Sequence, residues 1–337
     1  MSDSTAIVLS HDYELFFDKS GSLEQCLYKP CDALVAWAAG LRRRMTFFVD
    51  ATMILKFDEY AGAFREMRQA ASDVRRHVES LHKEGHEIAL HVHPHWLESR
   101  WSGGSWDFSG ARYALRQFSQ EDIAQLIETS SRCLADLAGA PPAAFRAGGF
   151  CVEPFHRLSD ALSSSGITID SSVVPGAFLN DPDRGYDFRD APDDDWWLFE
   201  RSPMEPTNGG PFTELPITAC RLPAAYYWRR LWQRMRGASA DSAFGDGTSR
   251  PIGARAVLGR LAGLGRVSEL SIDSAKAPHL RNADLGAQRR LWHIMGHPKL
   301  LSLASLEQLD RFVLENRIGT FETVSSAVAS IAARQSC

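Results

Sequence analysis

The first half of this chain alternates short strand-like runs with helical stretches, and this alternation constrains the fold more than any other feature. Runs rich in β-branched and aromatic residues occur at 6–10, 46–51, 86–92, 144–148 and 167–172. Helical patterns occur between or beside them at 72–84, 119–137 and 152–165. Each of these helical patterns is followed closely by a glycine, which is a common helix stop. Repeated β-α units predict a parallel sheet, either open or closed into a barrel.

The second half is less regular. Acidic, turn-forming sequence follows Asp181, and residues 236–253 are rich in Gly, Ser and Ala, which is typical of a mobile surface insertion. Strand-like runs return at 213–218, 266–272, 291–297 and 320–324, with a helical pattern at 305–316. We therefore expect one catalytic domain over residues 1–337, with a variable insertion at about 181–265.

Composition excludes several classes of protein. The 337 residues are 44% hydrophobic and 23% charged, as in ordinary globular proteins, and the net charge of −5 disfavours nucleic acid as a partner. The longest apolar run covers only residues 33–41, so no transmembrane helix is expected. The N-terminal sequence lacks the basic start and apolar stretch of a signal peptide. These features predict a cytoplasmic protein.

The densest chemical signal is the run GHEIALHVHPHW at residues 85–96. His91, His93 and His95 come at the end of a predicted strand, which is the edge where parallel α/β folds carry their active sites. Imidazole is a common ligand of zinc and similar ions. Three histidines within five residues therefore predict a metal site.

A second signal lies at the end of the first predicted strand. Asp12 and Glu14 are two residues apart, so in an extended chain their side chains point to the same face. Two carboxylates in one pocket could divide the roles of metal ligand and general base. Acidic pairs at strand ends are also common turn formers, so this pair alone does not decide the matter.

Two further strand ends carry polar residues. Arg146 is followed by Gly148 and Gly149, whose backbone N–H groups could approach a bound oxygen closely. Asp170 ends the next strand, where it could pair with Arg146. His297 follows the strand at 291–297. Parallel strands bring their carboxyl ends to one edge, so we expect these side chains to share a site.

Together these motifs resemble the NodB-type polysaccharide deacetylases, carbohydrate esterase family 4, and most closely their bacterial polysaccharide-biosynthesis branch. The resemblance spans roughly residues 6–300, apart from the insertion. It is carried by GHEI with H-x-x-x-H from His91 to His95, by FFVDA at 47–51, and by Arg146, Asp170 and His297. It implies a distorted (β/α)₇ barrel, a TIM-like α/β fold, and a metal-dependent N-deacetylase.

The resemblance also implies roles for individual residues. His91 and His95 would bind the metal together with Glu14, and Asp12 would be the general base. The family has an adjacent Asp-Asp pair where this chain has Asp12-Tyr13-Glu14, so Asp12 could be the ligand instead. His297 would be the acid, with Arg146 and Asp170 orienting the base. The implied ion is zinc, with cobalt, nickel or manganese as alternatives.

Two further residues of the histidine-rich run, His93 and Trp96, are candidates for contact with the substrate. His93 is expected on the opposite strand face from its neighbours, where it would contact substrate with Gly148 and Gly149, or serve as a third nitrogen ligand if the chain bends at Pro94. Trp96 is either a platform for a sugar ring or a buried anchor of its loop.

The expected substrate is an acylated amino sugar, free or linked to a lipid or nucleotide. Residues 224–236 place Trp228 and Trp232 at helical spacing, opposite three arginines. Such a segment could lie on a membrane surface or pack on the barrel.

Three other functions remain open at this point. A metal-dependent amidohydrolase would use the His91-x-His93 pair, but in that superfamily the pair comes on the first barrel strand and here it follows the third. A hydrolase of a non-sugar amide or formamide could use the same fold. A catalytically inactive barrel could bind glycans through its tryptophans without needing a metal.

Overall fold

The computed structural model describes residues 5–40, 43–235, 243–249, 266–282, 289–316 and 318–335. Most of the glycine- and serine-rich segment 236–253 lies outside the described residues, as does the remainder of the insertion up to 265. The expectation that this segment is mobile therefore falls largely outside the described part of the chain.

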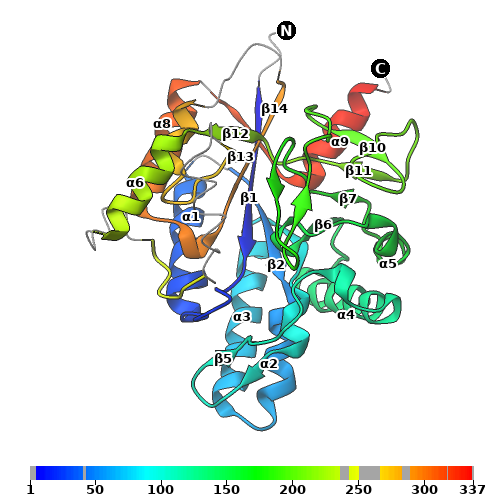
Figure 1. The fold of residues 1–337 in the computed structure, drawn as a ribbon, viewed down its shortest axis with the longest axis vertical. Helices are drawn as coiled ribbons and strands as arrows, with labels where there is room; N and C mark the ends of the chain where they lie inside the picture. Colours follow the sequence, from blue (N-terminus) through cyan, green and yellow to red (C-terminus); the bar gives the residue numbers. More distant parts are fainter. Residues whose placement is uncertain are drawn as a thin grey trace.

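A nine-stranded, mostly parallel sheet forms the centre of the molecule (Figure 1). Its order is β10-β11-β7-β6-β3-β2-β1-β14, with β15 also paired to β1. Every neighbouring pair is parallel except β10 with β11. The strands are β1 (Ala6–Tyr13), β2 (Thr46–Asp50), β3 (Glu87–Val92), β6 (Ala144–Ala147), β7 (Ile169–Asp170), β10 (Trp197–Phe199), β11 (Phe212–Glu214), β14 (Leu291–Gly296) and β15 (Thr320–Glu322).

The sheet curls until the chain that follows β11 meets β14. The backbone N–H of Thr218 donates to the carbonyl oxygen of His293 at 3.0 Å, and the N–H of His293 donates to Oγ1 of Thr218 at 2.9 Å. Leu270 and Ile272 add further backbone hydrogen bonds to Met295. The curled parallel sheet, joined in this way, confirms the predicted distorted (β/α) barrel.

Alternate residues of the strands fill the inside of this barrel in layers. One buried apolar layer includes Val8, Phe48, Ala89, Ala144 and Leu291. Two residues further along β1, β6 and β14, the interior side chains are polar. Every second side chain of a strand points to the same face, so further polar residues lie on the interior face at the carboxyl ends of the strands.

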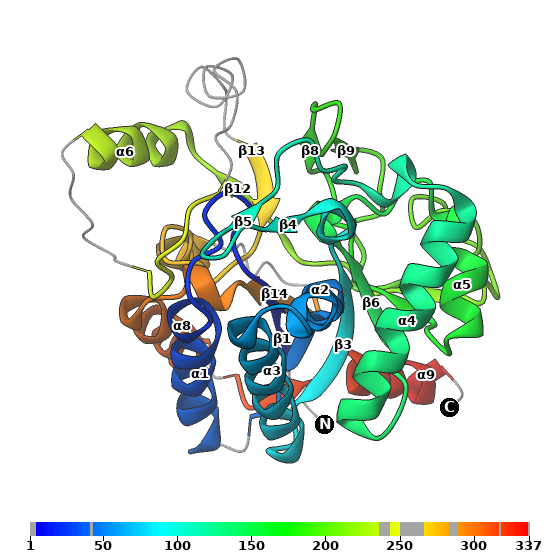
Figure 2. The same ribbon diagram turned by 90° about the horizontal axis from the view of Figure 1, so that it is seen from below.

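The helices lie around the sheet, most of them on the outside of the strands, as the view along the barrel shows (Figure 2). They are α1 (Lys29–Ala39), α2 (Ala51–Ala61), α3 (Arg65–Lys83), α4 (Gln120–Ala138), α5 (Ser159–Ser164), α6 (Ala224–Met235), α8 (Leu303–Glu315) and α9 (Val324–Gln335). Helix α6 lies at the periphery of the molecule, apart from the other helices in this view. Within the described residues, no helix combines the length and the apolar character that crossing a membrane requires.

Local sequence explains where several helices begin and end. Ser119 caps α4 by accepting a hydrogen bond from the backbone N–H of Asp122, and Gly139 ends it in the left-handed conformation with φ of 72°. This agrees with the prediction. The helix expected at 152–165 is shorter, because Pro154 lacks a backbone donor and the regular helix begins only at Ser159.

Short two-stranded ribbons decorate the barrel. They pair β4 (Arg100–Trp101) with β5 (Trp106–Asp107), β8 (Phe178–Leu179) with β9 (Tyr186–Asp187), and β12 (Ala219–Leu222) with β13 (Arg266–Glu269). Residues 243–249 of the insertion pack against the loop after β1, where the backbone N–H of Ser22 donates to Asp246 at 2.7 Å. The insertion thus contributes to the surroundings of the strand ends.

Candidate metal centre and catalytic site

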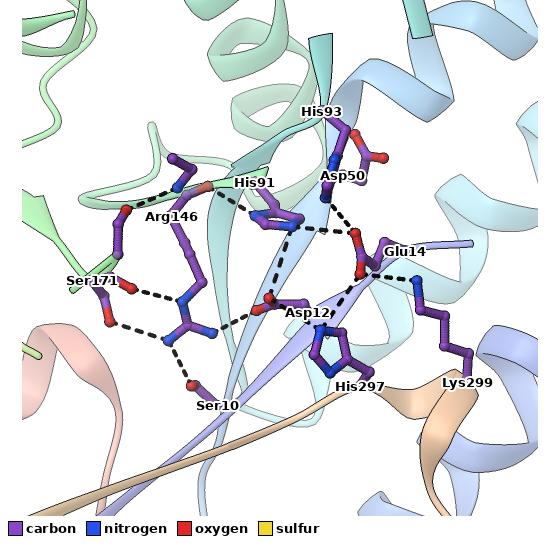
Figure 3. A network of polar contacts seen from close by, with 12 residues as sticks. Ser10, Asp12, Glu14, Asp50, His91, His93, Arg146, Ser171, His297 and Lys299 are labelled. Atoms are coloured by element: carbon purple, nitrogen blue, oxygen red, sulfur yellow. Dashed lines mark hydrogen bonds and ion pairs between the residues drawn. The ribbon is translucent and has the colours of Figure 1, made fainter. Parts of the chain in front are cut away.

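Polar side chains from the carboxyl ends of several strands converge beside one cavity of about 210 Å³. Asp12 and Glu14 come from the end of β1, and His93 and His297 follow β3 and β14. The aromatic side chains of Phe17, Tyr113 and Phe150 form much of the remaining cavity wall. The common edge expected for the polar residues is therefore present, and Figure 3 shows their arrangement.

Glu14, His91 and His93 form the group of buried ligand atoms best suited to a metal ion among the described residues. Oε2 of Glu14 lies 2.5 Å from Nε2 of His93 and 3.4 Å from Nε2 of His91. Apart from these contacts with one another, the three buried atoms have no hydrogen-bond partner in the described structure. Buried polar atoms that converge without partners are costly unless something binds them. Two imidazoles and one carboxylate match the donor set that zinc prefers.

The tautomer of His91 also suits a ligand. Its Nδ1–H donates to the carbonyl oxygen of Arg146 at 2.8 Å, because a carbonyl can only accept. In the neutral ring, which is the form that binds a metal, the lone pair is then on Nε2, which faces Glu14. Metal-binding histidines are commonly fixed in this way by a hydrogen bond from the other ring nitrogen.

His93, rather than His95, completes this group. The expectation that His93 lies on the opposite face from His91 is wrong, because residues two apart on an extended chain share a face, and both side chains reach Oε2 of Glu14. His95 lies beyond the strand in a short 3₁₀ turn over Pro94–Glu98. Its ring stacks on Tyr113 at 5.7 Å between centroids and meets the edge of Phe17 at 4.2 Å.

The surroundings of His93 explain one of the two predicted glycines. A Cβ atom at Gly148 would lie 2.6 Å from Nδ1 of His93 and 2.7 Å from the carbonyl oxygen of Val92. Thr52 holds the backbone from the other side, since its Oγ1 accepts a hydrogen bond from the N–H of His93 at 3.2 Å. Gly148 is thus required by the packing of His93.

Gly149 is required for a different reason. Its φ of 58° lies in the left-handed region, and a Cβ atom there would lie 2.6 Å from the hydroxyl oxygen of Tyr113. Gly149 also lines the cavity. Of the two glycines, it is the one whose backbone faces the space expected for substrate.

Asp12 is held by Arg146. Nη1 of Arg146 donates to Oδ1 of Asp12 at 2.5 Å, and Oδ2 of Asp12 faces the other way, 3.8 Å from Nε2 of His91 and 3.7 Å from Nε2 of His297. Burial alone would raise the pKa of Asp12, but Arg146, His91 and His297 lower it below its ordinary value. Asp12 therefore stays ionised at neutral pH, with one oxygen directed at the site.

Arg146 is fully buried, and its donors are nearly all used. Nε donates to the carbonyl oxygen of Ser171 at 2.8 Å, and Nη2 donates to the hydroxyls of Ser10 at 2.9 Å and Ser171 at 3.1 Å. The guanidinium also lies 4.0 Å above the ring of Phe48. This network fixes the guanidinium, and through it the carboxylate of Asp12.

His297 is oriented by a carboxylate that the sequence analysis did not single out. Nδ1 of His297 donates to Oδ2 of Asp273 at 3.1 Å, and Nε2 points toward Asp12 and Glu14. Burial would lower the pKa of His297, but Asp273, Asp12 and Glu14 together raise it to about 9. The imidazole is therefore protonated at neutral pH and can donate a proton.

The expected pairing of Asp170 with Arg146 does not form. Oδ1 of Asp170 instead accepts a hydrogen bond from the hydroxyl of Ser172 at 2.8 Å, and Asp170 is the register neighbour of Glu214 on β11. Burial raises the pKa of both carboxyls, and the proximity of Asp170 raises the pKa of Glu214 further. Asp170 thus belongs to a buried carboxyl pair in the barrel wall, next to the site.

Trp96 is a loop anchor, the second of the two alternatives. Its side chain has no exposed surface, and its indole Nε1–H donates to Oδ2 of Asp50 at 2.7 Å. The ring packs among Phe57, Trp106 and Phe108. No part of Trp96 reaches the cavity, so it does not offer a face for stacking.

Three residues of this region escaped the sequence analysis. Asp273 follows the strand-like run at 266–272, so a carboxylate at a strand end was the available signal. Lys299 lies two residues after His297, but nothing in the sequence predicts its contact with Glu14. Glu214 lies within the predicted strand at 213–218, and only the sheet register brings it to Asp170.

Similar proteins are found among solved structures. No family model and no curated protein matches the sequence. Among solved structures, the chain is similar to a Mycobacterium smegmatis protein assigned to the polysaccharide deacetylases, with 16% identity, a TM-score of 0.49, and coverage of 100% of this chain and 93% of that one. It is also similar to a family 4 carbohydrate esterase from Streptomyces lividans, with 11% identity, a TM-score of 0.40, and coverage of 94% and 91%.

A polysaccharide deacetylase from Bacillus cereus gives a comparable result, with 10% identity, a TM-score of 0.41, and coverage of 96% and 94%. These structures carry the family names that the motifs led us to expect. At such identities and TM-scores the similarity does not establish an activity. The function must therefore be argued from the site itself.

Proposed function

We propose that this protein is a metal-dependent hydrolase that removes an N-acetyl group from an amino sugar. The observation that carries the proposal is the convergence of Glu14, His91 and His93 as a ligand group beside an ionised Asp12 and a protonated His297. A ligand group, a base and an acid at one barrel edge are the parts that amide hydrolysis requires.

Glu14, His91 and His93 would hold one divalent cation. Zinc fits this nitrogen and oxygen donor set best, and cobalt, nickel and manganese are alternatives. When bound, the ion polarises the acyl oxygen and activates water for attack. In this proposal His93 takes the place of His95, the ligand that the family resemblance implies, because His95 packs against Phe17 and Tyr113.

Asp12 would accept the proton of the attacking water at Oδ2. Arg146 occupies its other oxygen, so the carboxylate has one free acceptor and a fixed orientation. The lowered pKa of Asp12 keeps this acceptor ionised over the neutral range. A positioned base of this kind contributes roughly 10²–10⁴ to the rate.

His297 would donate a proton from Nε2 to the departing amine. Asp273 holds the ring through Nδ1, and the raised pKa of about 9 keeps the imidazole charged at neutral pH. A backbone N–H at Gly148 or Gly149 would stabilise the oxyanion, since Gly149 lines the cavity, whereas the N–H of Ala147 is already bonded to Ser172. Arg146 acts through Asp12, and we assign Asp170 no contact with the reacting atoms.

The substrate class rests on the cavity wall. Phe17, Tyr113 and Phe150 offer aromatic faces next to the polar cluster, which suits an amino sugar with an apolar ring face and a short acyl group. A non-sugar amide or formamide is the alternative substrate for the same chemistry.

We also propose that α6 contacts an anionic membrane surface, where a lipid-linked substrate would be presented. Trp228 and Trp232 are 55% and 52% exposed and lie one turn apart on this peripheral helix, with exposed Arg229 beside them. Aromatic and basic side chains on one helix are typical of interfacial binding. Cosedimentation with anionic vesicles, compared with neutral ones, should be lost in the Trp228→Ala/Trp232→Ala variant.

The test of the main proposal joins metal content to acetate release. Mass spectrometry on the purified protein should find about one divalent ion per chain, and chitooligosaccharides should release acetate until a chelator is added. Asp12→Asn should keep the ion and lose about 10²–10⁴ of the rate. Glu14→Gln should lose the ion.

Other outcomes would change the assignment. If Asp12→Asn loses the ion and Glu14→Gln retains it, the ligand and the base are exchanged. If zinc does not bind even after soaking while glycans still do, the protein is a glycan-binding barrel and the hydrolase proposal is wrong.

A further inference from the structure

Lys299 is a buried lysine whose ammonium group binds the carboxylate of Glu14. Nζ donates to Oε1 of Glu14 at 2.9 Å and to the carbonyl oxygen of Leu15 at 2.7 Å. The two side chains are only 5% and 6% exposed. Nζ also lies 4.9 Å from the ring centre of Phe16 and 4.7 Å from that of Phe17. Two hydrogen bonds and two aromatic rings therefore fix the position of this charge.

As a result of this contact, the two carboxylate oxygens of Glu14 have different partners. Oε1 is taken by Lys299, while Oε2 faces His91 and His93 (Figure 3). A carboxylate held in this way presents one oxygen to the ligand group. Rotation that would bring both oxygens to an ion would break the hydrogen bond to Lys299 and leave a buried ammonium group with a single acceptor.

The contact also sets the charge of the site. Lys299 neutralises Glu14, Arg146 neutralises Asp12, and Asp273 balances the charged imidazole of His297. The two histidines contribute neutral nitrogen ligands when they bind an ion. A cation in this group would thus meet a site with little net negative charge, and its own charge would remain largely uncompensated.

Resting on the metal-dependent function proposed above, we propose that Lys299 is a positioning residue that holds Glu14 as a one-oxygen ligand and lowers the affinity of the site for its divalent cation. The charge that weakens binding of the ion should also strengthen polarisation of the substrate's acyl group, because a less neutralised ion attracts electrons from the acyl oxygen more strongly. Lys299 acts through Glu14 and the electric field of its charge.

Removing this charge should strengthen metal binding for three reasons that act in the same direction. The ion no longer meets a fixed positive charge a few ångströms away. Glu14 loses its partner, so the metal-free site becomes less favourable. Oε1 becomes available as a second ligand atom. A residue with only a structural role would, on removal, weaken the site instead.

The experiment compares Lys299→Met with Lys299→Arg in the full chain. Zinc dissociation constants are measured by competition with a chromophoric chelator, so the readout does not depend on catalysis. Lys299→Met should bind zinc about tenfold more tightly or better. Lys299→Arg keeps the charge, so its dissociation constant should stay within about threefold of the wild-type value.

Two further points keep the test decisive. Lys299→Gln, which retains a hydrogen-bond donor without the charge, serves in place of Lys299→Met should that variant not fold, and it too should bind more tightly. Zinc binding that is unchanged or weaker in the neutral variants overturns the role of Lys299 alone. A wild-type protein that binds no zinc overturns both this inference and the proposed function.

Discussion

Nη1 of Arg146 donates to Oδ1 of Asp12 over 2.5 Å, although 134 residues separate the two in the chain. Both side chains are almost completely buried, at 0% and 5% exposed. Arg146 is on β6 and Asp12 on β1, and β3 and β2 lie between these strands in the sheet, so the curl of the barrel brings the two side chains together across its interior. The pair joins the wall of the fold to the base of the proposed reaction. Stability and function are therefore coupled at this contact.

Arg146→Met should destabilise the fold strongly. The variant leaves Asp12 as an unpaired buried charge and removes four donated hydrogen bonds. We expect a loss of about 3–5 kcal/mol in the free energy of unfolding, measured by urea denaturation at neutral pH.

Arg132→Met is the matched control for this prediction. Arg132 pairs with Glu128 on the surface of α4, with both side chains more than half exposed. Its removal should change stability by less than about 0.5 kcal/mol. Similar losses in the two variants would contradict the structural role of Arg146.

His93→Ala and His95→Ala should differ in metal retention. Nε2 of His93 belongs to the ligand group, whereas the ring of His95 stacks on Tyr113. Metal analysis of the purified variants should find no ion in His93→Ala and close to one in His95→Ala. The reverse result would restore the ligand set implied by the sequence resemblance.

Gly148→Ala should weaken metal binding although it replaces none of the proposed ligand residues. The added Cβ would lie 2.6 Å from Nδ1 of His93, so the imidazole must shift. Displacing the support of a ligand typically costs about 10–100-fold in metal affinity. Gly104→Ala is the control, since a Cβ there meets nothing within 4 Å. Equal zinc affinity in both variants would show that His93 is not a ligand.

Glu214→Gln should change how stability depends on pH. Burial and the neighbouring Asp170 raise the pKa of Glu214 well above its ordinary value, so the folded state keeps this proton to a higher pH than the unfolded chain does. The contribution of Glu214 to wild-type stability is fully present below the unfolded pKa of about 4.3. It is lost as pH rises toward the pKa of Glu214 in the folded state. Glutamine cannot ionise, so the variant avoids this loss.

Urea denaturation between pH 4 and 8 measures this effect. Relative to wild type, Glu214→Gln should gain stability as pH rises, by up to about 1.4 kcal/mol per pH unit for one proton. Glu200→Gln, at an exposed position, should follow the wild-type curve. A constant difference between wild type and Glu214→Gln across the range would show that folding does not raise the pKa of Glu214.

The alternation of strands and helices determined the fold class from the sequence. Buried apolar strands such as residues 46–51 and capped helices such as Ser119 to Gly139 are local features, and local propensity and periodicity are sufficient to predict them. The same reasoning located most of the site, because strand ends in a parallel barrel meet at one edge. Asp12, Glu14, His91, Arg146 and His297 all followed from that rule.

Only the tertiary structure decided which of these residues contact each other. His93 completes the ligand group because β3 remains extended up to Pro94, which carries His93 to Glu14 and directs His95 into the aromatic wall. Arg146 reaches Asp12 across the barrel interior because the sheet curls, and Asp170 meets Glu214 because the register of β7 and β11 places them side by side. The contact of Lys299 with Glu14 joins residues 285 positions apart. No local pattern encodes such distances, since they depend on how the whole barrel closes.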